Sequence, residues 1–212
     1  MDFTKQTYCN QVTSYIRSLI RKGTLEIGAP VKEVVLSEQL GIREALQVLV
    51  QEGLITSEPQ KGKHVRQMTG KEIYDSYVVA GILEGAGVAE SLPLWTEANM
   101  ETFRAVVRQM EGKISYATKL DELAEIDELF HATLFMACDN TRLVEMARTS
   151  CATISKYLYY QHWITMFTPR EYADRHHAVA EAVYSRDVKH VETALRDHYK
   201  ETGLRMAQFG KE

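Results

Sequence analysis

The stretch LSEQLGIREALQVLVQEGLI, residues 36–55, decides how this sequence folds. Residues 36–40 have the spacing of a helical turn, and Gly41 can end that turn in a left-handed conformation. A second amphipathic run opens at Arg43, and its apolar face is formed by Ala45, Leu46, Leu49 and Val50. Two helices that meet at a steep angle need a turn of about three or four residues, but here only Gly41 and Ile42 are available. The stretch therefore predicts two helices and leaves the turn between them unexplained.

The flanking residues extend these helices into a small domain with a hairpin. An apolar stripe predicts an earlier helix that ends at Gly23, and its members are Val12, Ile16, Leu19 and Ile20. Residues 54–56 and 64–66 are extended in pattern, and the turn between them carries Lys61, Gly62 and Lys63. Three helices and a basic hairpin are typical of a winged helix-turn-helix, which places one helix in the major groove and hairpin lysines near phosphates. A small structural domain with a charged hairpin fits the same pattern.

Charge and composition are compatible with a DNA-reading domain joined to an acidic one. Residues 1–67 hold 9 Lys/Arg against 7 Asp/Glu, whereas the remainder holds 16 against 22. At 45% hydrophobic and 25% charged residues, the chain has an ordinary soluble composition. No apolar run approaches the ~20 residues that span a bilayer, and MDFTKQTYCN does not resemble a signal peptide. We expect a cytoplasmic protein with no membrane partner, in which Cys9, Cys138 and Cys151 are reduced thiols.

From Lys71 onward the sequence has helical periodicity throughout. Proline, glycine, asparagine and aspartate breaks separate six predicted segments, at 71–92, 96–115, 119–138, 140–165, 169–185 and 187–208. These segments predict an antiparallel helical bundle. The predicted fold class is therefore mainly α, with a winged helix-turn-helix domain at residues 1–69 and an all-helical domain at residues 70–212.

An aspartate and a histidine in AEIDELFHATLF are predicted to face the core of this bundle. Asp127 and His131 lie four residues apart on one helical face, beside the stripe formed by Leu123, Ile126, Phe130 and Leu134. A carboxylate and an imidazole that face inward cost free energy unless they are hydrogen-bonded or bind a metal. A hydrogen-bonded pair in the core and a pair of metal ligands both fit this pattern.

The later histidines can be sorted by the same test. His176 and His198 continue apolar stripes and are predicted to face inward, whereas solvated surface is expected for His162, His177 and His190. Three imidazoles and one carboxylate suit a divalent transition metal such as Zn or Ni, with open positions for water or a ligand. The predicted metal ligands are therefore Asp127, His131, His176 and His198.

The front of the chain also resembles a known family. IRSLIRKGTLEIGAPVKEVVLSEQLG and REALQVLVQEGLITSEPQKGKHV resemble the N-terminal head of GntR-type transcription regulators. The shared pattern is Leu-Ile-x-x-Gly, a Pro-Gly-like turn, Leu-Ala-x-x-Leu-Gly, Arg-Glu-Ala-Leu, Glu-Gly-Leu and a Gly-centred wing, over most of residues 11–66. The resemblance implies operator DNA as a partner. The residues that it implies in DNA contact are Arg43, Lys61, Gly62, Lys63 and His64.

One piece of the family pattern is absent between Gly41 and Arg43. The family has a segment like Ser-Arg-x-Pro plus an apolar residue there, about five residues that form the turn and start the recognition helix. Either the protein lost this reading edge, or the sequence omits a segment that the protein contains. The intact pattern on both sides favours an omitted segment. In that case the protein is heavier than 24.2 kDa by the mass of about five residues, and an arginine of the DNA contact is missing from the sequence.

Residues 70–208 resemble the FCD ligand-binding domain of the FadR branch of that family. DELFHATLFMACDN is similar to the pattern Asp-x-x-Phe-His-x-x-Leu-x-x-x-x-x-Asn, and RHHAVAEAV and ALRDHYKE are similar to the elements with its later histidines. In metal-binding members these positions, here Asp127, His131, His176 and His198, hold a divalent metal whose coordination a small organic acid completes. The family often has Arg-x-x-Leu-Glu in its first helix, where this chain has Ala80-Gly81-Ile82-Leu83-Glu84. The arginine partner of the acid is therefore in question.

Two functions of different class compete for this sequence. The first is a ligand-responsive regulator, most simply a repressor, that binds a palindromic operator as a homodimer and senses a small carboxylate at the metal. The alternative is a helical metal-dependent hydrolase, because open metal positions can activate water. That alternative gives the DNA-reading head no role, and a pure interaction module leaves the inward Asp/His set unexplained. The sequence favours the regulator and does not name the effector, the operator, the metal or the sign of regulation.

Overall fold

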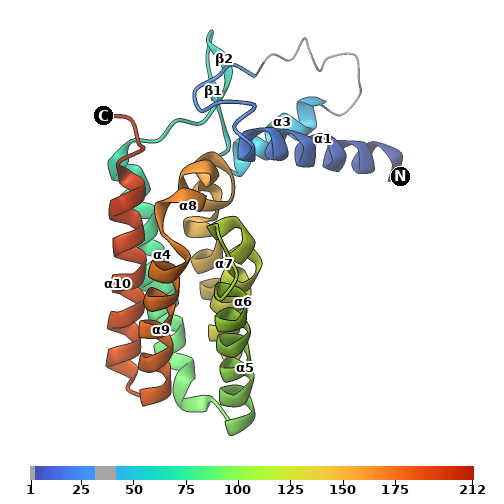
Figure 1. Cartoon of the computed structure of the whole chain (residues 1–212). Helices are drawn as coiled ribbons and strands as arrows, with labels where there is room; N and C mark the ends of the chain where they lie inside the picture. Colours follow the sequence, from blue (N-terminus) through green and yellow to red (C-terminus); the bar gives the residue numbers. More distant parts are fainter. Residues whose placement is uncertain (1–2, 32–41) are drawn as a thin grey trace. The chain divides into compact units, whose positions relative to one another are not determined.

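The computed structural model describes residues 3–31 and 42–212 (Figure 1). The helical turn predicted at 36–40 lies outside these residues, as does Gly41 at the short junction, so the omitted segment stays a prediction. The chain divides by its contacts into two compact units. The head unit comprises Met1–Thr69, Ala152–Gln161 and Gly210–Glu212, and the body unit comprises Gly70–Cys151 and His162–Phe209.

Two described helices of the head unit bury the apolar faces that the sequence predicts. These helices are α1 (Phe3–Arg21) and α3 (Ile42–Gln51). The buried residues on their apolar faces include Ile16, Ile20, Ala45, Leu46 and Leu49. The backbone turns after α3 at Gly53, whose φ of 72° is a left-handed conformation that strains residues with a Cβ atom. Burial therefore confirms most of both predicted stripes, although Val12, Leu19 and Val50 are only half-buried.

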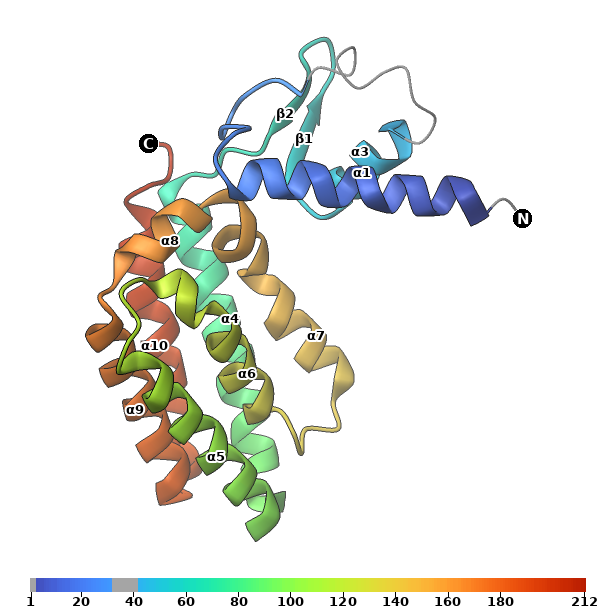
Figure 2. The ribbon, with the colours of Figure 1, turned by 45° about the vertical axis from the view of Figure 1, so that its right-hand side comes forward.

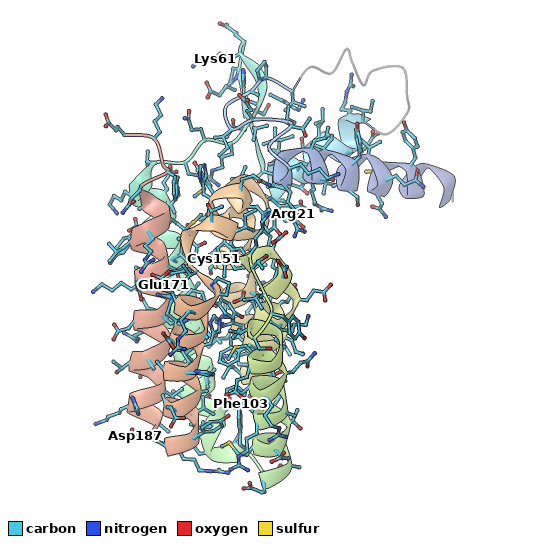
Figure 3. All side chains as sticks on the ribbon, in the orientation of Figure 1. Arg21, Lys61, Phe103, Cys151, Glu171 and Asp187 are labelled. Carbon is cyan, nitrogen blue, oxygen red and sulfur yellow. The ribbon has the colours of Figure 1, made fainter. Side chains whose placement is uncertain are left out.

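An antiparallel hairpin follows α3 and forms the predicted wing (Figure 2). Its strands are β1 (Ile55–Glu58) and β2 (Gly62–Val65), paired so that Glu58 lies opposite Gly62. Residues 28–31 line the other edge of β2, because Val31 N–H donates to the Lys63 carbonyl over 2.8 Å. The turn between the strands places Lys61 at the tip of the hairpin (Figure 3).

The body unit is a helical bundle, which confirms the predicted fold class. Its helices are α4 (Gly70–Ser91), α5 (Glu97–Ile114), α6 (Ala124–Leu134), α7 (Thr141–Ser150), α9 (Pro169–Ser185) and α10 (Val188–Ala207), with short 3-10 turns at Leu92–Leu94 and Leu120–Leu123. Thr96 and Thr168 begin α5 and α9 with reciprocal side-chain and backbone hydrogen bonds. The core includes Phe103 and Phe130, whose ring centroids lie 5.4 Å apart.

The prediction of one helix over residues 140–165 is wrong, because the helical type changes within this stretch. After α7, a π-helical turn spans Ile154–Leu158, and α8 (Tyr160–Met166) follows. A π turn closes its hydrogen bonds over five residues instead of four, so side chains before and after it face different directions. The buried side chains Ile154, Leu158 and Tyr159 consequently belong to the head unit, although α7 belongs to the body unit.

Helix α4 is more apolar than the sequence analysis expected. Residues Gly70–Leu94 are long and apolar enough to cross a membrane by length and composition alone. More than half of the most apolar part of this segment is buried inside the structure. Helices α10 and α7 pack against α4, and this burial is typical of the core helix of a globular domain.

Candidate functional site

Three histidines on three helices of the body unit converge. His131 of α6, His176 of α9 and His198 of α10 each offer a ring nitrogen within 4.8 Å of the other two. The ring centroids of His176 and His198 lie 4.8 Å apart, and those of His131 and His198 lie 5.3 Å apart. Nitrogen atoms at this spacing need only small side-chain movements to share one ion with Zn–N bonds of ~2.0–2.1 Å.

Asp127 meets this cluster through His176. Nδ1 of His176 lies 2.8 Å from the carbonyl oxygen of Tyr172, which can only accept, so Nδ1 carries a proton. Nε2 of a neutral His176 is then an acceptor, and it lies 3.1 Å from Oδ1 of Asp127, which is an acceptor too. Two acceptors at this distance repel each other unless a proton or a cation lies between them. Burial lowers the pKa of His176 and so disfavours the proton, and this pair of atoms could therefore hold a metal cation.

A buried carboxylate that the sequence analysis did not assign orients the His131 ring. Glu84 of α4 is 3% exposed, and its Oε1 lies 2.6 Å from Nδ1 of His131. Its Oε2 accepts a hydrogen bond of 2.8 Å from the Tyr199 hydroxyl. Because a carboxylate accepts, Nδ1 of His131 donates and Nε2 remains for the cluster. Glu84 could have been found from the sequence, since it lies one helical turn from the buried Ala80 and Val88.

Burial and neighbouring charges set different pKa values for the three imidazoles. Burial opposes a charge on His131, but Glu84 more than offsets this and raises the pKa of His131 to about 9. Burial, with the other two imidazoles and Arg175, holds the pKa of His198 well below its ordinary value. His198 and His176 are therefore neutral at pH 7, ready to bind a metal, whereas His131 holds a proton that a metal must displace.

His198 is fixed in place through its backbone. Its Nδ1 is buried and makes no hydrogen bond within the described part of the chain, which is costly unless a metal or a donor meets it. Arg175 of α9 donates from Nη2 to the His198 carbonyl over 2.6 Å and to Oγ1 of Thr202 over 2.6 Å. Arg175 also forms an ion pair with Glu201. Arg175 leaves no signal in the sequence, because no apolar stripe distinguishes it from a surface arginine.

The other histidines of the body unit lie outside the cluster. His190 is exposed, and the His177 side chain is 40% exposed, with Nε2 lying 3.3 Å from Oε1 of Glu111. The expectation of solvated surface needs correction for His162, which is half-buried and stacks on Phe209 with ring centroids 4.0 Å apart. The packing of a neighbouring aromatic ring accounts for this difference.

The position at which the FCD pattern often has arginine holds a small buried residue here. Ala80 is fully buried on α4, one turn before Glu84. Arg175 is close enough for its charge to affect the pKa values of His131 and His198. A guanidinium group is thus present near the cluster, but it comes from α9 instead of α4.

The head unit presents the predicted DNA-contacting residues on α3 and the wing. Arg43 is exposed at the second residue of α3. Lys61 at the hairpin tip has a side chain that is 73% exposed and lies 2.7 Å from Oε2 of Glu58. Gly62 begins β2, and Lys63 and His64 follow it as half-buried residues. An exposed ion pair is weak, so Lys61 can exchange its carboxylate partner for a phosphate.

Both parts of the chain match known protein families. Residues 75–201 match the FCD domain, and residues 9–65 match the bacterial regulatory proteins of the gntR family. The probable D-xylose utilization operon transcriptional repressor of Paenarthrobacter nicotinovorans is 30% identical over 149 residues, which cover 66% of this chain and 64% of that relative. The chain thus spans less than two thirds of the length of that relative.

A second relative and a solved structure extend the likeness over more of the chain. The HTH-type transcriptional repressor RspR of Escherichia coli (strain K12) is 24% identical over 193 residues, which cover 87% of this chain and 82% of the relative. The structure of E. coli McbR/YncC has a TM-score of 0.70 at 19% identity and covers 95% of this chain and 97% of that one. At this identity the structural likeness concerns the fold.

A winged helix-turn-helix head and a helical domain with a partly buried Asp/His cluster define a class of proteins, DNA-binding regulators with a sensory domain. The FCD match extends over more than half of the chain. The chain belongs to the GntR family of transcription regulators, in the FadR branch that carries an FCD domain. These relatives are transcription regulators and not enzymes, so we do not retain the alternative of a metal-dependent hydrolase.

Proposed function

We propose that the protein is a ligand-responsive transcription repressor that senses a small organic acid at a metal centre in its body unit. The observation that carries the sensory part is the approach of His176 Nε2 to Asp127 Oδ1 over 3.1 Å, because a metal cation between two acceptors would stabilise both. All four proposed ligands fall within the residues that match the FCD domain. The FCD match thus supports a proposal in which the metal and the effector share one site in the body unit.

The donor set suits Zn or Ni, with nitrogen from His131, His176 and His198 and oxygen from Asp127. When bound, such a metal supplies a Lewis acid with positions open to a carboxylate. Outer hydrogen bonds prepare the imidazoles for this role, since the Tyr172 carbonyl holds one ring and Glu84 holds another in the tautomer that leaves Nε2 free.

A small carboxylate is the proposed effector class. The buried Ala80 provides no cation where the family often has arginine, so the acid would be held mainly by the metal. Arg175 is committed to the His198 carbonyl, Thr202 and Glu201. Its charge contributes a favourable field, and its hydrogen bonds hold α9 against α10.

Operator DNA is the proposed partner of the head unit. The N-terminal side chains of a recognition helix reach base edges, and Arg43 is exposed at this end of α3. Lys61 and Lys63 would neutralise phosphates from the wing, while Gly62 and His64 let its backbone approach the DNA. Arg43 is therefore proposed as the main described contact.

A homodimer in the cytoplasm completes the proposal. Two heads related by a two-fold axis can occupy successive major grooves of a palindromic operator. Light scattering of the purified protein should give twice the chain mass. A monomer at micromolar concentration would contradict this part of the proposal and leave the metal centre unaffected.

Metal analysis of protein purified without chelator tests the sensory proposal. We expect about one Zn or Ni per chain, since one cluster of three histidines is present in the described residues. His177→Ala is the matched control, because His177 neighbours His176 in sequence but pairs with Glu111 outside the cluster. A chain that binds neither metal under chelator-buffered loading would contradict the proposed centre.

A further inference from the structure

Three segments of the head unit are joined by hydrogen bonds at one buried residue. Met68 is 4% exposed, and its N–H donates to the Tyr159 hydroxyl over 3.1 Å. The same hydroxyl donates to the Met68 carbonyl over 3.3 Å, and the Lys211 N–H donates to that carbonyl over 2.9 Å. Tyr159 is 1% exposed, so little water is available to replace these bonds. We call Met68, Tyr159 and Lys211 the Met68 clasp.

Each member of the clasp lies close in sequence to a point where the chain passes between the two units. These points are Thr69–Gly70, Gln161–His162 and Phe209–Gly210. On the body side of the first, α4 begins and later carries Glu84. Near the third, α10 ends after it has carried His198. Two helices that build the metal centre therefore connect through the backbone to the clasp.

These two helices pack too closely to slide past each other. A Cβ atom on Gly81 of α4 would lie 2.8 Å from Cβ of Tyr199, and one on Gly203 of α10 would lie 2.8 Å from Cβ of Tyr77. Interiors packed this closely transmit displacement instead of absorbing it. His198 lies about 14 Å from the end of α10, from a rise of ~1.5 Å per residue. A shift at the metal centre is thus passed along both helices to their ends.

On the head side, the clasp is continuous with the wing. Met68 follows β2 closely in sequence, and the Arg66 N–H between them donates to the Leu54 carbonyl over 2.9 Å. A second bond supports the same region, because the Thr153 hydroxyl donates to the Glu52 carbonyl just after α3 over 3.3 Å. Movement of the backbone around Met68 would therefore displace β2, which carries Lys63, and the adjoining turn with Lys61.

We infer that the Met68 clasp couples occupancy of the metal centre to the conformation of the wing, an inference that rests on the proposed metal function. The Tyr159 hydroxyl is the positioning group, since it holds both backbone atoms of Met68. A ligand shifts the wing only if it binds one arrangement of α4 and α10 more tightly than another. The clasp supplies the route by which that preference reaches the DNA-binding surface.

Hydrogen exchange of the full chain, metal-free and with chelator-buffered Zn(II), tests this inference. In the wild-type protein, Zn(II) should slow exchange in α6 and change exchange in residues 54–66 by at least about twofold. Tyr159→Phe removes only the hydroxyl. It should keep the Zn(II) Kd within about twofold of wild type and the slowed exchange in α6, but lose the Zn-linked change in residues 54–66. A merely structural role would lower Tm and leave that linked change intact.

Two further variants keep the test decisive. Tyr15→Phe is the matched control, because Tyr15 is 58% exposed on α1 and its hydroxyl should not matter. Gly70→Ala keeps all three clasp residues but places a Cβ 2.6 Å from the Ala207 carbonyl oxygen, which should separate the start of α4 from the end of α10 and weaken the wing response.

Three outcomes would overturn the inference in different ways. A full wing response in Tyr159→Phe would remove the clasp from the coupling. Wild-type protein that binds Zn(II) without any wing response would overturn the coupling and leave the proposed metal centre standing. Wild-type protein that binds no Zn(II) by calorimetry would overturn the metal centre, and the inference with it.

Discussion

The wing and the histidine cluster, which is the proposed metal centre, each contain a cation–carboxylate pair, but in opposite surroundings. Lys61 and Glu58 lie 2.7 Å apart with side chains 73% and 51% exposed, whereas His131 and Glu84 lie 2.6 Å apart with side chains 17% and 4% exposed. Exposed pairs contribute little and exchange partners readily, while breaking a buried pair leaves a charge without compensation. The proposed DNA contact in the head would therefore use charges that can change partners, whereas the proposed metal centre in the body would use charges held in place.

The largest effect is expected when one of the proposed metal ligands is removed. His198→Ala should lower Zn(II) affinity by at least about a hundredfold, because the site loses one of its three imidazole ligands. Binding of the head to operator DNA without effector should persist. Calorimetry and electrophoretic shift assays measure the two properties, and equal loss of both would mean that the two units are not separable in this way.

Proton competition at His131 should give the next largest effect. Glu84 raises the pKa of His131 to about 9, so below pH 9 a metal must displace a proton from this imidazole. Zn(II) affinity should fall about tenfold per pH unit from pH 9 to pH 7 and level off above pH 9. Calorimetry in buffers of different ionisation enthalpy should detect release of about one proton at pH 7. The absence of any pH slope in this range would contradict the fixed His131–Glu84 pair.

Removing the buried Glu84 carboxylate should reduce the pH dependence of Zn(II) binding. Glu84→Gln keeps the size of the side chain but not its charge, so the pKa of His131 should drop and the slope between pH 7 and pH 9 should flatten. At pH 9 the variant should bind Zn(II) about tenfold more weakly, as is usual when an outer hydrogen-bond partner is lost. Glu125→Gln is the control, since its side chain is 94% exposed on the neighbouring turn of α6; a similar loss there would indicate a nonspecific charge effect.

In the head, the largest described contribution should come from Arg43. Arg43→Ala should weaken operator binding by up to about tenfold, because an exposed arginine at the start of the recognition helix reaches bases or phosphates. Metal affinity should not change. Shift assays on operator and on unrelated DNA separate base reading from phosphate contact, and wild-type affinity on both would remove α3 from the interface.

The smallest effect is expected at the exposed ion pair of Lys61 and Glu58. Lys61→Ala should weaken binding to every DNA sequence by only about two- to threefold and reduce the salt dependence, as loss of one exposed phosphate contact does. Lys63→Ala provides the comparison on β2. A sequence-specific loss from Lys61→Ala would show that the hairpin tip reads bases, contrary to the proposed role.

How much could be predicted from the sequence depends on whether a feature repeats with helical period. The apolar stripes placed the helices of the bundle and the inward position of His176, because core packing selects residues at that spacing. The wrong prediction of one continuous helix over residues 140–165 has a different cause. A π turn changes the direction of side chains without changing composition, so periodicity alone could not locate it.

Helical periodicity could also predict only some residues of the candidate site. Its histidines stand out because a polar residue on an apolar stripe is unusual, and Glu84 could have been found by the same test applied to α4. Arg175 could not have been found in this way, because its role depends on a hydrogen bond of 2.6 Å from its Nη2 to the His198 carbonyl of α10. The Met68 clasp joins residues far apart in the sequence, and such long-range pairing leaves no local signal.

The π-helical segment also bears on the order in which the protein can be made. The head unit contains Ala152–Gln161, whose Ile154, Leu158 and Tyr159 are among its buried residues. A ribosome therefore synthesises most of the body before the head can close over these side chains. During that interval the emerging N-terminal segment exposes the apolar surface of α1 that later packs on the π turn. A fragment ending at Thr69 should accordingly aggregate or recruit chaperones, although the sequence pattern alone suggests an autonomous domain.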